Sequence, residues 1–216
     1  TIVSGLVLFS STLMADNLKV ALAAEPTSMD PHYQNLTINN SFATQVFNAL
    51  VLQDVNQNLI PGLASSWTPV DENTWEFKLR PGVKFHNGAS FSAEDVVATM
   101  KRAANVPNSP SSFGTFIKGK TFEIIDDLTL HVSTEKPYPF TPNDMSRVAI
   151  IDSAFENATT EDFNTGKATF GTGPFTFSKW MPGDLIEIKR NDNYWGSAVE
   201  WDSITIRPIK DGTTRT

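Results

Sequence analysis

The stretch from Thr74 to Arg102, TWEFKLRPGVKFHNGASFSAEDVVATMKR, decides the interpretation of this chain. From Trp75 to Arg80, apolar and charged side chains alternate, which is the period of a strand with one buried face. Pro81-Gly82 then ends the strand, because proline fixes φ and glycine tolerates positive φ. A second alternation and a turn follow over residues 83–88. The pattern predicts two short strands joined by a tight corner.

A capped helix is predicted directly after this turn. The Ser92 side chain is placed to accept the N–H of Asp95 while Asp95 reaches back, a variant of the capping box with Asp in place of Glu. Glu94 and Asp95 also suit the positive N-terminus of a helix. Apolar residues at helical spacing give a helix over 93–104 its buried face. They are Val96, Val97, Met100 and Ala103.

The composition is that of a globular protein and excludes several classes of function. The 216 residues are 40% hydrophobic and 19% charged, with a formal net charge of −7. No basic cluster exists to bind nucleic acid or to seek anionic lipid. The absence of cysteine removes disulfides, thiolate catalysis and cysteine metal sites. The histidines, His32, His86 and His131, lack ligand spacing, so the sequence indicates no metal and no cofactor.

An uncharged and mostly apolar run, IVSGLVLFSSTLMA, occupies residues 2–15. It is too short to span a bilayer and is typical of the apolar region of a signal peptide, with cleavage after Ala15. The charged segment and the initiator Met are missing, and Leu13 is large for its position before the cleavage site. A buried strand or helix is the alternative. We expect residues 1–15 to be a signal-peptide remnant and the mature protein to be soluble.

The remaining apolar patterns predict an alternation of strands and helices. Residues 18–24, LKVALAA, form a near-continuous apolar run, which predicts a first strand in a sheet covered on both faces. Residues 157–168 are polar and predicted to be irregular. The other predicted elements are a helix from Asn39 or Asn40 to about Leu50, a hairpin over 52–59, and strands over 121–126, 128–134, 145–152, 175–180, 184–190 and 201–208.

Two loops stand out as candidate binding segments from their residues alone. Residues 105–114 are rich in Pro and Ser, and such loops carry function more often than cores do. Phe113 and Thr115 offer an aromatic ring and a hydroxyl to a ligand; alternatively, Phe113 and Phe116 fill the gap under the loop. In Gly171-Thr172-Gly173-Pro174, two glycines permit close backbone approach. A phosphate cradle is disfavoured there, because Pro174 lacks an N–H and a strand follows.

A third segment, EPTSMDP over residues 25–31, has two prolines that restrict its backbone. Its residues alone favour a rigid connection between a strand and a helix. In the family that residues 74–102 resemble, the corresponding segment lines the ligand cleft. Glu25 would then meet an ammonium group, or it faces solvent.

The stretch 74–102 resembles the signature of the family 5 extracytoplasmic solute-binding proteins of ABC transporters, the peptide and nickel type. Members read roughly W-x-F-x-L-R-x-G-V-x-F-H-D-G-x-x-F-x-A-x-D-V, and Asn87 stands where Asp is commoner. Other segments are similar to further motifs of the family. They are EPTSMDP at 25–31, PGLASSW at 61–67, GTGPF at 171–175 and RNDNYW at 190–195.

The resemblance covers about residues 18–212 and implies an α/β fold of the periplasmic-binding-protein-like class, type II, in the peptide-binding-protein cluster. It implies that residues 16–60 and 168–216 form an incomplete first ligand-binding lobe. Residues 61–167 would form an inserted α+β subdomain. The second lobe is expected to be missing from this sequence.

The function that the resemblance implies is capture of a small solute in the periplasm, most simply a di- or oligopeptide. A monomer would deliver the solute to the transmembrane subunits of an ABC permease by hinge closure. Peptide-binding relatives hold the extended ligand by main-chain hydrogen bonds. The residues that we expect to bind the ligand are Glu25, Pro26, Thr27, Ser28, Phe113, Thr115, Gly171, Thr172 and Gly173.

Three other functions remain open at this point. Within the same family, the solute would be a nickel chelate, an oligosaccharide or an opine. A secreted hydrolase is disfavoured, because no carboxylate pair sits on paired motif loops and no G-x-S-x-G occurs. A truncated interaction module that binds no solute is the third possibility.

Overall fold

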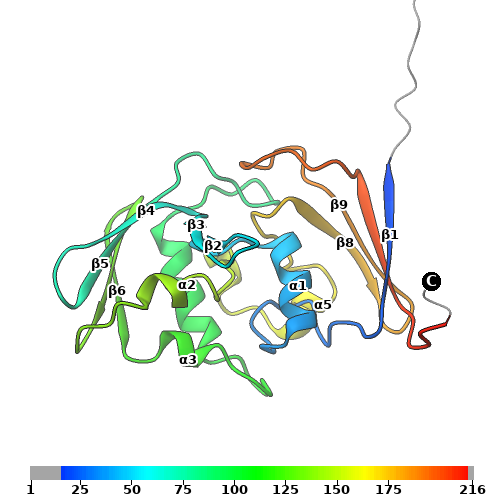
Figure 1. The fold of residues 1–216 in the computed structure, drawn as a ribbon, viewed down its shortest axis with the longest axis horizontal. Coiled ribbons are helices and arrows are strands. Elements are labelled where there is room, and N and C mark those ends of the chain that lie inside the picture. Colours follow the sequence, from blue (N-terminus) through cyan, green and yellow to red (C-terminus); the bar gives the residue numbers. More distant parts are fainter. Residues whose placement is uncertain (1–15, 214–216) are drawn as a thin grey trace, which may run out of the picture.

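The computed structural model describes residues 16–213, so the predicted signal-peptide remnant lies outside the described residues. Figure 1 shows two sheets at opposite ends of the molecule, with the helices between them. The order of elements mixes strands and helices throughout the described chain. The predicted α/β class is therefore confirmed.

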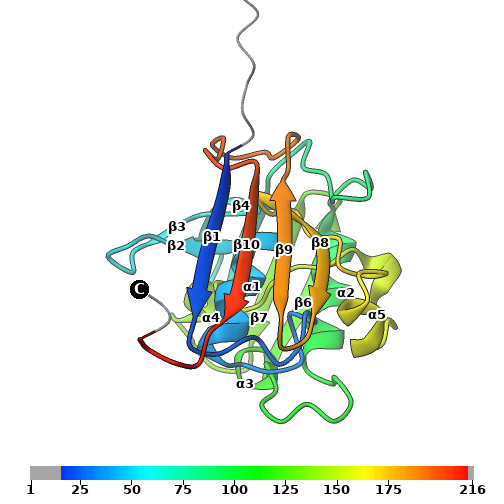
Figure 2. The same cartoon turned by 90° about the vertical axis from the view of Figure 1, so that its right-hand side faces the viewer.

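The first sheet has the order β1-β10-β9-β8 and joins the two ends of the described chain. Its strands are β1 (Asn17–Leu22), β8 (Phe175–Met181), β9 (Leu185–Arg190) and β10 (Ser203–Pro208). β1 lies parallel to β10, with Asn17 opposite Ser203, and the other neighbours are antiparallel. This sheet is seen face-on in Figure 2, with α1 (Thr37–Val46) behind it.

The expectation that the first strand is covered on both faces is wrong. Side chains in β1 alternate between exposed and half-buried, so only one face packs on the interior. Lys19 and Ala21 belong to the exposed set, whereas Leu18 and Val20 pack against a buried cluster. The apolar run is nearly continuous because it includes alanines, whose small side chains tolerate exposure to solvent.

The second sheet has the order β4-β5-β7-β6 and is wholly antiparallel. Its strands are β4 (Ala64–Pro69), β5 (Thr74–Leu79), β6 (Lys120–Asp126) and β7 (Thr129–Thr134). Helix α2 (Ala93–Ala103) begins with the predicted capping box between Ser92 and Asp95. The second alternation of the opening stretch is not a strand, because only Lys84 and Ser90 form an isolated bridge there.

The remaining elements are short. β2 (Val51–Gln53) and β3 (Leu59–Pro61) form the predicted hairpin. Its turn is held by Asp54, whose carboxylate accepts the N–H groups of Asn56 and Asn58 at 2.8 Å. The short helical segments are α3 (Gly114–Ile117), α4 (Thr141–Asp144), η1 (Ser153–Phe155) and α5 (Thr160–Asn164).

Three predicted elements differ from the structure. Helix α1 begins at Thr37, before the predicted cap at Asn39 or Asn40. The buried Asn39 side chain does not cap the helix but accepts the N–H of Thr27 at 3.3 Å. Residues 145–152 are buried or half-buried except for the exposed Arg147, but they form no strand, and only a single bridge joins Ala49 to Ala149. The segment 157–168 contains α5, which starts with a second capping box, between Thr159 and Asp162.

Two buried apolar clusters form the interior. The first packs under the second sheet and includes Phe77, Val96, Leu130 and Ile150. The second packs between α1 and the first sheet; Phe42, Val46, Ile151, Phe163 and Ile186 are among its members. The neighbours Ile150 and Ile151 belong to different clusters, so the chain passes from one interior to the other at this point.

Candidate functional site

A hollow of about 450 Å³ opens between α1, the β2–β3 hairpin and residues 146–149. Four of its lining residues come from or adjoin the loops and motifs singled out in the sequence: Pro31, Phe113, Pro174 and Tyr194. The other lining residues are Asn40, Ala43, Thr44, Phe47, Asn48, Ala49, Leu52, Gln53, Ile60, Ser146, Arg147 and Ala149. Hollows of about 580 and 570 Å³ lie elsewhere, but neither brings these segments together.

Phe113 is the one expected ligand-binding residue that lines this hollow. Its side chain is only 2% exposed and belongs to the first apolar cluster. Its ring meets the ring of His32 edge-on, with 6.1 Å between centroids, and that of Phe116 at 6.3 Å. Phe113 therefore fills the space under its loop and also forms part of the wall of the hollow.

The residues from Glu25 to Ser28 are held by other parts of the protein. The Glu25 carboxylate accepts the N–H of Gly183 at 3.0 Å. The Thr27 hydroxyl donates to Gln34 Oε1, and the Ser28 hydroxyl donates to Asn164 Oδ1, both at 2.7 Å. Pro26 lines a separate apolar hollow of about 180 Å³ beside β1 and α1. None of the four lines the larger hollow.

The Gly171–Gly173 loop packs against the C-terminal end of α1. Gly173 N–H donates to the carbonyl oxygen of Val46 at 2.9 Å, which satisfies one of the helix's terminal carbonyls. A Cβ atom at Gly171 would lie 1.9 Å from the same oxygen, so only glycine fits. The buried Thr172 hydroxyl donates to Asn48 Oδ1 at 3.1 Å. The loop thus supports the wall, while Pro174 reaches the hollow.

Thr115, the last of the expected residues, is exposed at the start of α3. It lines the hollow of about 570 Å³ together with Lys118, Lys120 and Tyr138. The structure therefore separates Thr115 from Phe113, although the two are close in sequence.

His86 is a supporting residue that sequence reasoning missed, because it was interpreted as part of a turn. Its Nδ1 accepts the N–H of Gly171 at 3.2 Å, and its Nε2 donates to the carbonyl oxygen of Gly173 at 3.0 Å. Burial lowers the pKa of His86, which keeps the ring neutral in this arrangement. The only sequence signal was a histidine beside the glycine turn.

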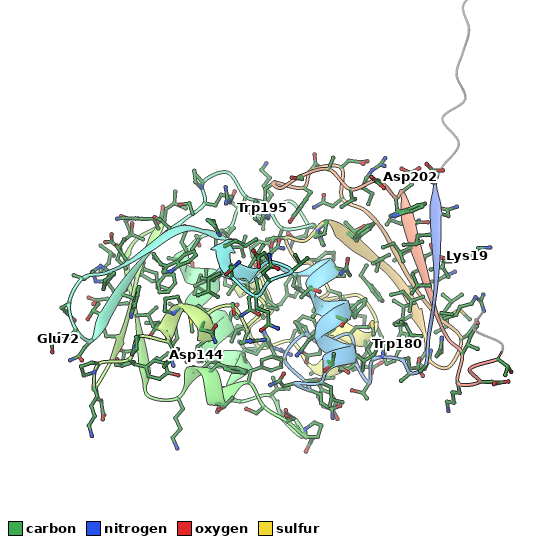
Figure 3. The ribbon with its side chains drawn as sticks, viewed as in Figure 1. Lys19, Glu72, Asp144, Trp180, Trp195 and Asp202 are labelled. Atoms are coloured by element: carbon green, nitrogen blue, oxygen red, sulfur yellow. The ribbon has the colours of Figure 1, made fainter. Side chains whose placement is uncertain are left out.

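Trp195 connects the two sheets and lies between them, in the upper middle of the molecule (Figure 3). Its Nε1 donates to Asn48 Oδ1 at 3.1 Å, beside the hydroxyl of Thr172. The guanidinium of Arg80 lies 4.4 Å from the centre of its ring, a cation–π contact. Trp195 therefore fixes Asn48, which lines the hollow.

A buried ionic network lies directly behind the wall. The side chain of Arg102 donates to both carboxylate oxygens of Asp30, at 2.9 and 2.7 Å. It also donates to Nδ1 of His32 at 2.9 Å, while Nε2 of His32 donates to the carbonyl oxygen of Ala149 at 2.7 Å. His32 thus contacts Phe113 and Ala149, both of which line the hollow.

The network is built for a neutral histidine beside a charged pair. Burial, the largest cause, and the charge of Arg102 together lower the pKa of His32 to about 4, against the opposing effects of Asp30 and of the hydrogen bond to Ala149. Burial raises the pKa of Asp30, but the hydrogen bonds and charge of Arg102 outweigh it, so the pKa lies below its ordinary value. Desolvation is tolerated because both carboxylate oxygens of Asp30 and both terminal nitrogens of Arg102 have partners.

The fold and this arrangement of supporting loops define a protein of the type II periplasmic-binding class. NikZ from Campylobacter jejuni, solved in complex with Ni(L-His), matches with a TM-score of 0.81 at 27% identity. The match covers 94% of this chain and 41% of that one. The DppA periplasmic binding protein from Helicobacter pylori, in complex with peptide STSA, matches the fold with a TM-score of 0.82 at 24% identity, covering 93% and 44%.

Curated relatives agree with this class. The glutathione-binding protein GsiB of Pectobacterium atrosepticum is 30% identical over 203 residues, which are 93% of this chain and 40% of that protein. GsiB of Escherichia coli K12 is 30% identical over 211 residues, 95% of this chain and 41% of that protein. The chain therefore spans about 40% of the length of the curated relatives it matches.

Residues 58–216 match the model of the bacterial extracellular solute-binding proteins, family 5 Middle. The chain belongs to this family, and the resemblance carried by residues 74–102 is confirmed. The relatives named above are solute-binding proteins. Between residues 16 and 213, no helix is long and apolar enough to cross a membrane.

Proposed function

We propose that this chain belongs to the extracytoplasmic substrate-binding component of an ABC importer that captures di- or oligopeptides in the periplasm. The monomeric protein would deliver the solute to the transmembrane subunits of the permease by hinge closure. Membership of the family supports the transport role. The observation that carries the proposal is the hollow where Pro31, Phe113, Pro174 and Tyr194 meet.

The chemistry of the hollow suits a peptide. Amide side chains such as Asn40 and Gln53 can pair with peptide groups, and Phe47 and Leu52 offer apolar surface to side chains. Solute pockets combine these two kinds of lining, because apolar contact supplies affinity and a few polar groups fix orientation. The DppA structure, described with a peptide, is a relative by fold.

The nine expected residues take different parts in this proposal. Phe113 would contact the solute, and Gly171–Gly173 would hold the wall through α1 and Asn48. Glu25 to Ser28 would fix the path of the chain into Pro31. Thr115 would lie outside the cleft unless the rest of the protein brings the solute to it.

A nickel chelate is the second candidate, favoured by the similarity to NikZ in complex with Ni(L-His). Within residues 16–213, no group of three His, Asp or Glu side chains is placed to hold a metal ion. A metal bound in this hollow would therefore arrive already chelated, and the protein would bind the chelator.

Native mass spectrometry of the full-length protein from its own periplasm tests the proposal. We expect a co-purified peptide, and calorimetric binding of peptides from a mixed pool. A nickel-containing or sugar mass, with no binding from the pool, would contradict the peptide assignment. Hydrolysis of the recovered solute, lost on replacing a single carboxylate, would instead indicate an enzyme.

A further inference from the structure

Strand β6 forms a free edge of the second sheet. Its neighbour in that sheet is β7, and no other segment between residues 16 and 213 forms a backbone hydrogen bond with residues 120–126. Ile124 and Ile125, near the end of the strand, are 46% and 48% exposed. A free edge that carries apolar side chains is a surface on which another strand can pair.

The opposite edge of the same sheet is protected against such pairing. β4 exposes the polar Ser65, Ser66 and Thr68 and ends at Pro69, which cannot donate a backbone hydrogen bond. β6 contains no proline, and a bulge between Ile124 and Asp126 leaves two consecutive isoleucines outside the core. β6 is therefore the edge of this sheet that keeps both backbone donors and apolar surface.

The charge around the two isoleucines is negative. Glu123 precedes them, Asp126 and Asp127 follow them, and all three side chains are exposed. No salt bridge among the described residues involves Glu123 or Asp127. Carboxylates along an edge repel a second copy of the same edge, and they attract a strand that carries basic side chains.

Ile124 also lines a hollow of about 430 Å³ between β6, α2 and η1. The apolar part of its wall is completed by Val97, Ala98 and Ala154. Glu94 and Glu156 supply carboxylates, while Ser153 and Lys101 complete the lining, and Lys101 is already paired with Glu156. A lysine or arginine side chain matches this wall, because it combines an apolar stem with a cationic head.

The geometry of a sheet connects the free edge with this hollow. A strand paired with β6 would place every second side chain on the side of the sheet where the hollow lies. None of the residues that line the 450 Å³ hollow lines this one, so the two surfaces are separate.

We propose that the edge of β6 is a docking surface for another protein, which adds an extended segment to the second sheet. The segment would alternate lysine or arginine with apolar residues. Its apolar side chains would cover Ile124 and Ile125, and a basic side chain would enter the hollow towards Glu94. Main-chain hydrogen bonds would supply affinity, and the basic residues would supply the choice of partner.

The test uses hydrogen exchange of the full-length protein, which reports where a probe protects the backbone. The probe is a seven-residue peptide with blocked ends in which lysine alternates with valine, and its counterpart carries glutamate in place of lysine. The variants are Ile124→Ser, which removes apolar surface, and Glu94→Lys, which reverses a charge. Glu72→Lys is the matched control, because Glu72 is an exposed glutamate in the turn between β4 and β5. Thermal melts check that every variant is folded.

We expect the lysine peptide to slow amide exchange within residues 120–126 and the glutamate peptide to leave it unchanged. The peptide concentration that gives half of this protection should rise about 10-fold in Ile124→Ser and in Glu94→Lys, as for one strong contact of an interface. Glu72→Lys should behave as wild type. All three variants should bind the solute of the wild type with unchanged affinity, because the docking surface is separate from the 450 Å³ hollow.

Several results would overturn the inference. Equal protection by the two peptides would show that charge does not choose the partner, and protection confined to residues 146–149 would place the peptide in the 450 Å³ hollow. Slow exchange, without peptide, of the β6 amides that do not pair with β7 would show that another part of the full-length chain covers the edge. A dimer that is lost in Ile124→Ser would assign the edge to a second copy.

Discussion

His32 carries its single ring proton on Nε2, where it is donated to Ala149, and this makes the fold sensitive to acid. The ordinary pKa of 6.5 applies in the unfolded chain, whereas burial lowers the folded value to about 4. Between these values the unfolded chain binds the extra proton and the folded chain does not. The contribution of the neutral His32 to the free energy of unfolding is therefore fully present above about pH 6.5 and falls as the pH drops towards 4.

The expected size of this loss is about 3 kcal/mol between pH 7 and pH 4, at about 1.4 kcal/mol per pKa unit. Urea unfolding of the full-length protein at several pH values measures it. His32→Gln should be less stable at pH 7 but should lose less on acidification. His86 also has a lowered pKa and adds to the same window, so His86→Gln is the comparison variant. Parallel pH curves for wild type and His32→Gln would contradict this account.

Arg102 and Asp30 show what a sequence conceals at the scale of single residues. They are separated by 72 positions, and nothing local distinguishes this arginine from a solvent-exposed one at the end of a helix. Arg102 is only 7% exposed because Phe163 and Asp30 surround it. Such roles depend on contacts between distant segments, which periodicity does not report.

Individual elements were more predictable where local signals agreed. The alternation from Trp75 and the capping box at Ser92 located β5 and α2 almost to the residue. The strand predicted over residues 145–152 does not form. A short apolar run has the same composition whether or not a neighbouring strand pairs with it, so the sequence could not show this. Helix α5 was missed because its start signal, Thr159 with Asp162, lies in a polar segment.

The loop at Gly171 provides a prediction at the scale of elements. Gly171→Ala would place a Cβ atom 1.9 Å from the carbonyl oxygen of Val46, so α1 and the loop must separate. We expect a destabilisation of about 3 kcal/mol, the upper part of the range for overpacking, together with weaker solute binding. Unfolding and calorimetry of the full-length variant measure both effects.

Gly114→Ala is the control for this substitution. Its Cβ atom would approach only the Ser112 hydroxyl closely, at 3.0 Å, and would lie 3.6 Å from the carbonyl oxygen of Ala104. It should therefore cost much less than Gly171→Ala. Equal costs for the two variants would show that the contact with Val46 does not matter.

For the whole molecule, we propose that residues 16–60 and 168–216 form the first ligand-binding lobe and residues 61–167 an inserted subdomain. Most members of the two apolar clusters follow this division, although Leu50 and Val51 of the proposed lobe belong to the first cluster. Ile151 and Phe163 pack with the first sheet, so the C-terminal part of the inserted segment would contact the lobe. The Asp30–Arg102 pair would then join the lobe to the subdomain.

Because the hollow is open on one side, the isolated chain should bind poorly. Pockets for small solutes bury most of the ligand surface, and one wall supplies only part of that contact. We expect residues 16–216 to bind the solute of the full-length protein at least about 100-fold more weakly, as measured by calorimetry on both proteins. Binding of comparable strength would show that the opposite wall is dispensable.

The pairing of β1 with β10 has a consequence for the order of folding. Asn17 lies opposite Ser203. β1, the first strand of the described chain to be synthesised, therefore cannot pair until β10, the last one, has been made. Pairing across such a sequence separation is slow, because a long loop must close first. In the meantime β1 has two open edges, and the charge of Lys19 discourages association with other unfinished chains. Folding of this protein thus depends on a strand that stays soluble while unpaired.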